Sequence, residues 1–134
     1  MPTGPAAAER GLLDTSIFIA QESGRALGTL PTAAAISVVT VAELHLGVLM
    51  ADWSAVRASR LRTLTSVQNI FEPLPIDSEV ARAFAEIVAE ARRHGRRPKI
   101  MDTWIAATAI THGLPVYTRD DDFATIPGIQ VFRI

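Results

Sequence analysis

The segment Gly11-Leu12-Leu13-Asp14-Thr15-Ser16 passes from apolar to polar residues within six positions. Residues 11–13 have the character of a short buried strand ending at Asp14, and residues 15–21 favour a helix. The same pattern then recurs, because residues 35–39 are apolar and rich in β-branched side chains, and residues 40–50 have helical spacing. Strands that alternate with helices in this way predict βαβ units.

This alternation continues to the end of the chain. The remaining predicted elements are helices at 52–69, 77–95 and 101–112, an extended link or edge strand at 71–76, strands at 115–118 and 129–132, and a helical turn at 122–125. Asp52 and Asp77 are the expected N-caps of two of the helices. The stripe expected to face the core after Asp52 comprises Val56, Leu61, Leu64 and Val67. The pattern predicts an α/β fold with a mainly parallel sheet and helices on both faces.

Composition limits the function classes. The chain has 134 residues, of which 49% are hydrophobic and 20% charged, as expected of one compact domain at residues 11–134 after a flexible lead-in at residues 1–10. The absence of cysteine excludes disulfides, thiolate zinc sites and cysteine nucleophiles, and it fits a reducing cytoplasm. With a net charge of −1, no global positive field attracts nucleic acid, so such a partner requires a local basic patch or a bound metal.

Neither a signal peptide nor a membrane span is expected. Residues 1–10 lack a basic start and a long apolar centre. The most apolar stretch, residues 33–42, has about half of the roughly twenty residues that a bilayer span needs.

Four carboxylates stand out by their positions. Asp14 ends the first strand, Glu43 lies one turn into the second helix, Asp102 opens the apolar helix, and Asp120 follows the third strand. The carboxyl ends of parallel strands share one edge, so these side chains are expected to converge there. Carboxylates at close range repel one another unless a cation or a proton neutralises them, and an all-oxygen cluster favours Mg²⁺ or Mn²⁺. Such ions activate water for attack on phosphorus, as in two-metal nucleases.

Each carboxylate also has a purely structural interpretation. Asp14 is a plausible helix cap, Thr40 and Glu43 match a capping box, Asp102 suits the first turn of a helix dipole, and residues 120–122 match an acidic turn. Asp102 argues most strongly against this interpretation, because its sequence neighbours are apolar and burying a carboxylate there is costly. All four caps would also have to fall at one sheet edge by accident.

These residues lie in four ordered motifs. The motifs are Leu12-Leu13-Asp14-Thr15-Ser16, Thr40-Val41-Ala42-Glu43-Leu44, Ile100-Met101-Asp102-Thr103-Trp104-Ile105-Ala106-Ala107 and Thr118-Arg119-Asp120-Asp121-Asp122-Phe123. Together they resemble the motifs of PIN-domain nucleases, over nearly the whole chain from Gly11 to Ile134. Within that family, the length and the closing Ile126-Pro127-Gly128-Ile129 resemble VapC toxins of bacterial toxin–antitoxin pairs.

The resemblance implies a three-layer α/β/α PIN-like fold and a magnesium-dependent endoribonuclease, with Mn²⁺ able to substitute. It also implies inhibition by a VapB-type antitoxin. The catalytic acids implied are Asp14, Glu43, Asp102 and Asp120, and the metal ligands are Asp14, Asp102, Asp120 and Asp122. The supporting hydroxyls implied are those of Thr15, Ser16 and Thr118, whereas Asp121 is expected to serve only the turn. The high apolar content further suggests a homodimer within a toxin–antitoxin hetero-oligomer.

A basic segment precedes Asp102. Residues 92–99 contain five of the thirteen Lys and Arg residues. The candidates for gripping RNA phosphates are Arg93, Arg96, Arg97 and Lys99. The alternative is a solvated helix end, where cations are favoured by the dipole.

Three other functions share part of this pattern. A receiver domain also binds magnesium at strand ends, but it requires a middle strand that ends in Asp and a late Lys, and Lys99 is the only lysine in this chain. A haloacid-type phosphatase requires an Asp two residues after Asp14, where Ser16 stands. A non-catalytic nucleic-acid-binding module remains open, and a magnesium-titrated nuclease assay distinguishes it from an enzyme.

Overall fold

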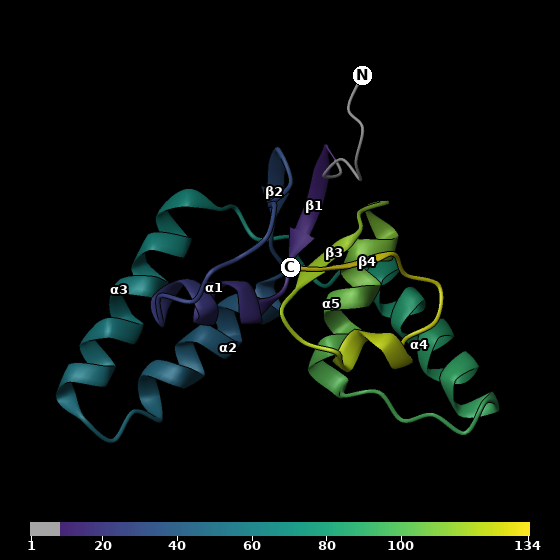
Figure 1. Cartoon of the computed structure of the whole chain (residues 1–134). Helices are drawn as coiled ribbons and strands as arrows, with labels where there is room; N and C mark the ends of the chain where they lie inside the picture. The colour runs from purple at the N-terminus through teal and green to yellow at the C-terminus, as the bar shows by residue number, and fades with distance from the viewer. Residues whose placement is uncertain (1–8) are drawn as a thin grey trace.

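The computed structural model describes residues 9–134 and alternates strands with helices (Figure 1). The strands are β1 (Arg10–Leu13), β2 (Ala33–Ala35), β3 (Val116–Thr118) and β4 (Val131–Arg133). The helices are α1 (Thr15–Glu22), α2 (Val38–Leu49), α3 (Ser54–Ile70), α4 (Ser78–Arg93) and α5 (Ile100–Thr111), with a 3₁₀ turn, η1 (Asp122–Thr125). Of the predicted lead-in, residues 1–8 lie outside the described residues, and Arg10 already belongs to β1.

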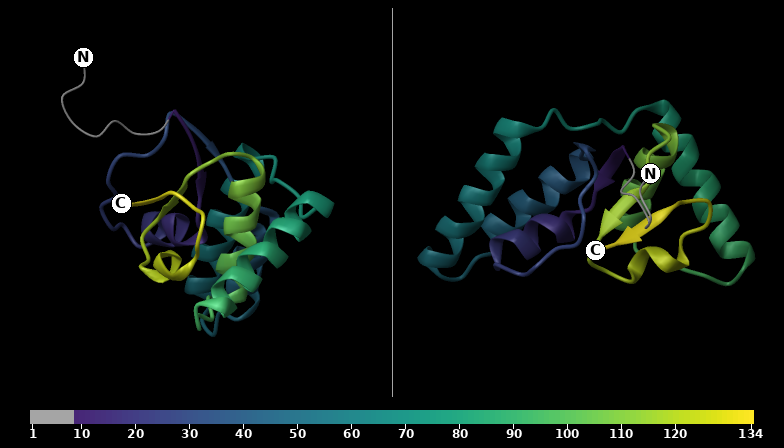
Figure 2. Two further views of the ribbon diagram at one scale, coloured as in Figure 1. Left: turned by 90° about the vertical axis from the view of Figure 1, so that its right-hand side faces the viewer. Right: turned by 45° about the horizontal axis from the view of Figure 1, so that its top comes forward.

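The four strands form a sheet in the order β2-β1-β3-β4, and every pair is parallel. Successive side chains of a strand point to opposite faces. Accordingly, Leu12 and Val116 belong to one buried cluster with Ile105 of α5, whereas Leu13 and Tyr117 belong to a second cluster. The second cluster contains residues of α1, α2 and α3. Helices α1–α3 and helices α4–α5 therefore cover opposite faces (Figure 2), which confirms the predicted three-layer α/β/α fold.

The second strand lies earlier in the chain than the sequence predicts. The prediction is residues 35–39, but β2 ends at Ala35 and α2 begins at Val38. Ser37 is the N-cap of α2, and its hydroxyl accepts a hydrogen bond of 3.0 Å from the Val39 amide. This cap satisfies an otherwise unpaired amide and outweighs the β propensity of the two valines. Leu74 pairs with Ser37 in an isolated parallel bridge, so the predicted link at 71–76 makes only minimal strand pairing.

Helix α3 also differs from its prediction. Trp53 occupies the N-cap in place of Asp52. Leu64 and Val67 are buried as expected, but Val56 and Leu61 are 37% and 49% exposed. The first turns of α3 and the end of α2 form a hairpin that projects from the sheet (Figure 1), so apolar spacing continues beyond the region that the core covers.

The C-terminal half follows the sequence more closely. Asp77 caps α4, and its carboxylate accepts a hydrogen bond of 3.0 Å from the Val80 amide. Helix α5 and η1 lie at the predicted positions, and β4 begins two residues later than expected. Among the described residues, no helix is long and apolar enough to cross a membrane.

A candidate active site at the carboxyl edge of the sheet

The predicted acids gather where β1 and β3 end. Asp14 directly follows β1, and Asp120 follows β3 by two residues. Glu43 comes from the second turn of α2 and Asp102 from the first turn of α5. The charge of Asp120 acts on Asp14 and Glu43, and the charge of Asp14 acts on Glu43 and Asp102, so these four side chains form one cluster.

Asp14 is held by hydroxyl groups. It stands at the N-cap of α1, but its side chain makes no capping hydrogen bond. One carboxylate oxygen, Oδ2, instead accepts hydrogen bonds of 2.7 Å from Ser16 Oγ and 2.9 Å from Thr118 Oγ1. Burial of the side chain, which is only 2% exposed, raises the pKa of Asp14, and the two hydroxyls oppose that shift. The two hydroxyls lower the pKa of Asp14 more than the Ser16 backbone does, so a helix cap alone does not explain this residue.

The same hydroxyls fasten the loop that carries Asp120. The Arg119 amide donates to Ser16 Oγ at 2.9 Å, and the Asp120 amide donates to Thr118 Oγ1 at 3.0 Å. The negative charge of Asp120 in turn contributes to the raised pKa of Asp14. The backbone amide of Arg119 was not predicted to have a role, and side-chain patterns give no signal for such a donor.

Glu43 is bonded to α1 and not to the start of its own helix. Thr15 donates a hydrogen bond of 2.7 Å to Glu43 Oε1, and Thr15 Oγ1 lies 2.9 Å from Thr40 Oγ1. Since Ser37 is the cap of α2, the capping box of Thr40 and Glu43 does not form. Partial burial raises the pKa of Glu43, the Thr15 hydroxyl opposes the shift, and Asp14 and Asp120 add to it.

Asp102 has the most perturbed carboxyl group of the cluster. Its Oδ2 atom is buried and has no hydrogen-bond partner among residues 9–134. Desolvation, followed by repulsion from Asp14, Asp122 and Glu43, raises the pKa of Asp102 to about 7, and Lys99 partly opposes the shift. A buried acceptor without a partner costs free energy. This oxygen is therefore available to a ligand.

Two further acidic residues are bound by cations of the chain. Asp122 Oδ2 lies 2.8 Å from Lys99 Nζ, and this pair raises the pKa of Lys99. Asp121 points elsewhere, because it is 83% exposed and pairs with Arg133 at 2.9 Å. The structure thus brings Asp122 and Lys99 to the acidic cluster and leaves Asp121 outside it.

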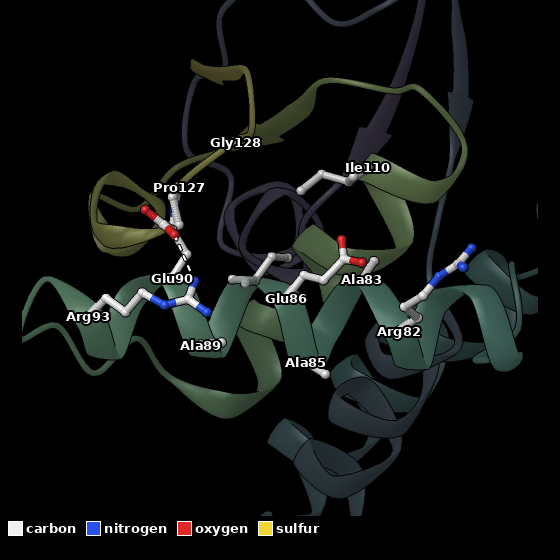
Figure 3. Close-up of a pocket in the computed structure, with 11 residues that line it drawn as sticks. Arg82, Ala83, Ala85, Glu86, Ala89, Glu90, Arg93, Ile110, Pro127 and Gly128 are labelled. Atoms are coloured by element: carbon white, nitrogen blue, oxygen red, sulfur yellow. Dashed lines mark hydrogen bonds and ion pairs between the residues drawn. The ribbon is translucent and has the colours of Figure 1, made fainter.

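The basic segment is divided between two places. Lys99 lies against the acids, whereas Arg93 pairs with Glu90 on α4 at 3.1 Å. Arg96 and Arg97 are exposed and follow the end of α4. A surface hollow of about 650 Å³ next to Arg93 is lined mainly by α4, with Ile110 and Pro127 opposite (Figure 3). None of the clustered acids lines that hollow, so it is separate from the candidate site.

The chemistry of the cluster fits a divalent cation. Its donors are all oxygens, one of them buried and unpartnered, and hard cations prefer such ligands. Within residues 9–134, no three Asp, Glu or His side chains are close enough to form a complete metal site.

Comparison with known proteins identifies the class. The model of the PIN domain matches residues 11–129. Ribonuclease VapC5 of Mycobacterium tuberculosis is 48% identical over 139 aligned positions that cover 100% of both chains, and Ribonuclease VapC4 of the same organism is 43% identical over 93% of this chain and 97% of its own. The chain belongs to the PIN domain family and, within it, to the VapC proteins.

Solved structures agree with this assignment. A VapBC-5 toxin–antitoxin structure from Mycobacterium tuberculosis superposes with a TM-score of 0.84, at 44% identity over 94% of this chain and 99% of that one. FitAcB from Neisseria gonorrhoeae gives a TM-score of 0.72 at 34% identity, over 90% and 95% of the two chains. PIN-domain VapC nucleases generally depend on a divalent metal. The family assignment decides against the receiver-like and phosphatase alternatives.

The raised pKa of Asp102 predicts how stability depends on pH in the absence of metal. Because that pKa is about 7 and the ordinary pKa of an aspartate is 3.8, the folded protein binds a proton that the unfolded chain releases. Stability should therefore fall as the pH rises from about 3.8 to about 7. Asp102→Asn should reduce this loss of stability. At pH 8 the wild-type side chain is charged and the asparagine is not, so the melting temperature should rise by a few degrees.

Thermal melts in EDTA from pH 5.5 to 8 test this expectation. Asp121→Asn is the control, since Asp121 is exposed and paired outside the cluster. Identical pH slopes for wild type and Asp102→Asn would show that Asp102 is not the titrating group.

Proposed function

We propose that this protein is the toxin of a type II toxin–antitoxin pair and a magnesium-dependent endoribonuclease, with Mn²⁺ able to substitute. The main support is the buried, unpartnered oxygen of Asp102 within a cluster of carboxylates. The names of the VapC5 and VapC4 relatives, both ribonucleases, support RNA as the substrate. A cytoplasmic site of action follows from that substrate and suits a chain without cysteine.

The acids have different proposed tasks. Asp14, Asp102 and Asp120 would hold the cation, with Asp122 assisting once it separates from Lys99. A bound Mg²⁺ supplies positive charge that stabilises the developing negative charge on the phosphate and acidifies water. Glu43 would orient the attacking water and accept its proton. Ser16 and Thr118 hold Asp14, and Thr15 holds Glu43, so the acids are positioned before substrate arrives.

A partner is also part of the proposal. Structures of relatives include VapBC toxin–antitoxin complexes, which supports a cognate VapB-type antitoxin for this chain. The α2–α3 hairpin exposes Leu49, Met50 and Trp53 by 69%, 68% and 73%, an apolar surface suited to burial against protein. A homodimer assembled with antitoxin chains is the proposed oligomer. The antitoxin could insert an arginine, which would pair with the site carboxylates and compete with the cation.

The first test of this function is metal-dependent cleavage. Purified protein should cleave RNA with Mg²⁺ or Mn²⁺ and stop with EDTA. Asp14→Asn should lower kcat/KM at least about 100-fold, as expected when charge stabilisation in the transition state is lost. Asp121→Asn should remain within about twofold of wild type. Full activity in EDTA, or full activity of Asp14→Asn, would contradict the proposed metal-dependent mechanism.

The second test concerns RNA binding by the proposed grip at Arg93, Arg96, Arg97 and Lys99. Replacing Arg96 and Arg97 with Ala should weaken RNA binding and reduce the slope of log Kd against log salt by about 1.5, since two phosphate contacts are lost. The matched control replaces the exposed Arg62 and Arg82 on α3 and α4, which changes the net charge equally. Equal slopes for the two double variants would mean that the segment is only a solvated helix end.

The third test concerns the antitoxin. Expression of the chain alone should arrest growth, and expression with the neighbouring antitoxin gene should restore growth and yield a complex of several chains without nuclease activity. Asp102→Asn should be harmless alone and yet still co-purify with the antitoxin. A chain that is monomeric, harmless and indifferent to the product of the neighbouring gene would refute the toxin role but leave the nuclease assignment standing.

A further inference from the structure

Thr40 directs its hydroxyl away from its own helix. In α5, the hydroxyls of Thr103, Thr108 and Thr111 each donate to the carbonyl four residues earlier, which is the usual partner of a helical threonine. Thr40 is as fully buried as Thr103 and Thr108, at 0% exposure, but its Oγ1 lies 2.9 Å from Thr15 Oγ1. The carbonyl four residues before it, on Ile36, accepts instead from the Leu74 amide at 2.8 Å.

The hydrogen bonds that join Thr40, Thr15 and Glu43 can have only one set of donors and acceptors. Thr15 Oγ1 lies 2.7 Å from Glu43 Oε1, and an ionised carboxylate can only accept, so the single Thr15 proton points to Glu43. The Thr15 oxygen is then left as an acceptor, and the proton 2.9 Å away on Thr40 fills that role. The resulting direction is from Thr40 to Thr15 to Glu43, across the junction of α2 and α1.

We propose that Thr40 is a positioning residue for Glu43, acting through Thr15. This inference rests on the proposed nuclease function for its consequence, though not for its geometry. A hydroxyl has one proton and two lone pairs, so a donor at a lone pair of Thr15 Oγ1 favours the orientation in which the Thr15 proton points to Glu43. Hydrogen bonds in series also strengthen one another, which holds the Glu43 carboxylate in place against the negative charges of Asp14 and Asp120.

The test compares Thr40→Val with Thr40→Ser. Valine keeps the shape of threonine and removes the donor, whereas serine keeps the donor. Thr40→Val should lower kcat for RNA cleavage about tenfold, the effect of losing about one hydrogen bond's worth of stabilisation, with KM for RNA within twofold. Thr40→Ser should remain within threefold of wild type.

A matched control separates positioning from stability. Thr108→Val also removes a fully buried hydroxyl from a helix, but that hydroxyl donates only to the Trp104 carbonyl. Its kcat should stay at the wild-type value. In a Glu43→Gln background, Thr40→Val should cause no further loss, because the group through which it acts is gone. An independent tenfold loss in that background, or an equal loss in Thr108→Val, would overturn the proposal.

A second readout does not require activity. In protein labelled with ¹³C-carboxyl glutamate, the Glu43 signal is identified by its absence in Glu43→Gln. At pH 8 without metal, Thr40→Val should shift that signal, and Thr40→Ser and Thr108→Val should not. An unmoved signal in Thr40→Val overturns the proposal even if the wild type cleaves RNA. If the wild type is inactive, the nuclease function is refuted, but a shifted signal in Thr40→Val still supports the positioning role of Thr40. If Thr40→Val does not fold, Thr40→Ala replaces it in both measurements.

Discussion

Burial of the Asp14 carboxylate at the end of β1 is the constraint on which the site depends. A carboxylate that is 2% exposed loses most of its hydration, and two hydroxyl donors, Ser16 and Thr118, replace part of it. The same two hydroxyls also accept hydrogen bonds from the backbone amides of Arg119 and Asp120. The hydroxyls that solvate Asp14 therefore also hold the loop after β3 in place. Hydrogen bonds centred on the Asp14 carboxylate thereby link the start of α1 to the end of β3.

These hydrogen bonds depend on the sheet, which holds the ends of β1 and β3 next to each other. Leu12 and Leu13 point to opposite faces, and each joins a different buried cluster, as do Val116 and Tyr117. Because both faces of β1 and β3 are packed, their ends cannot shift relative to each other without disturbing two cores. The acids are thus kept at fixed positions along one edge, and burial, with a smaller contribution from their mutual repulsion, raises the pKa values of Asp14, Glu43 and Asp102. Functional sites commonly carry a local destabilisation that the rest of the fold offsets.

Two basic side chains form ion pairs with acidic residues outside the buried part of the cluster. Lys99 neutralises Asp122 at one side of the cluster, and Arg133 draws Asp121 away from it. The buried side, with Asp14 and Asp102, has no ion pair with a basic side chain among the described residues. A divalent cation would therefore find its strongest uncompensated negative charge there, while the Lys99 pair sets the outer limit of the site.

The sequence by itself determined the fold class and the convergence of the acids. Alternating elements require a parallel sheet, and parallel strands bring Asp14 and Asp120 to the same edge. The start of α2 depends on a local cap at Ser37 and on tertiary pairing with Leu74, which together override the β propensity of Val38 and Val39. Tertiary structure also decided what Thr40 and Lys99 contact. Hydrogen bonds and ion pairs between residues 23 to 28 positions apart depend on how helices pack, and local spacing carries no record of that packing.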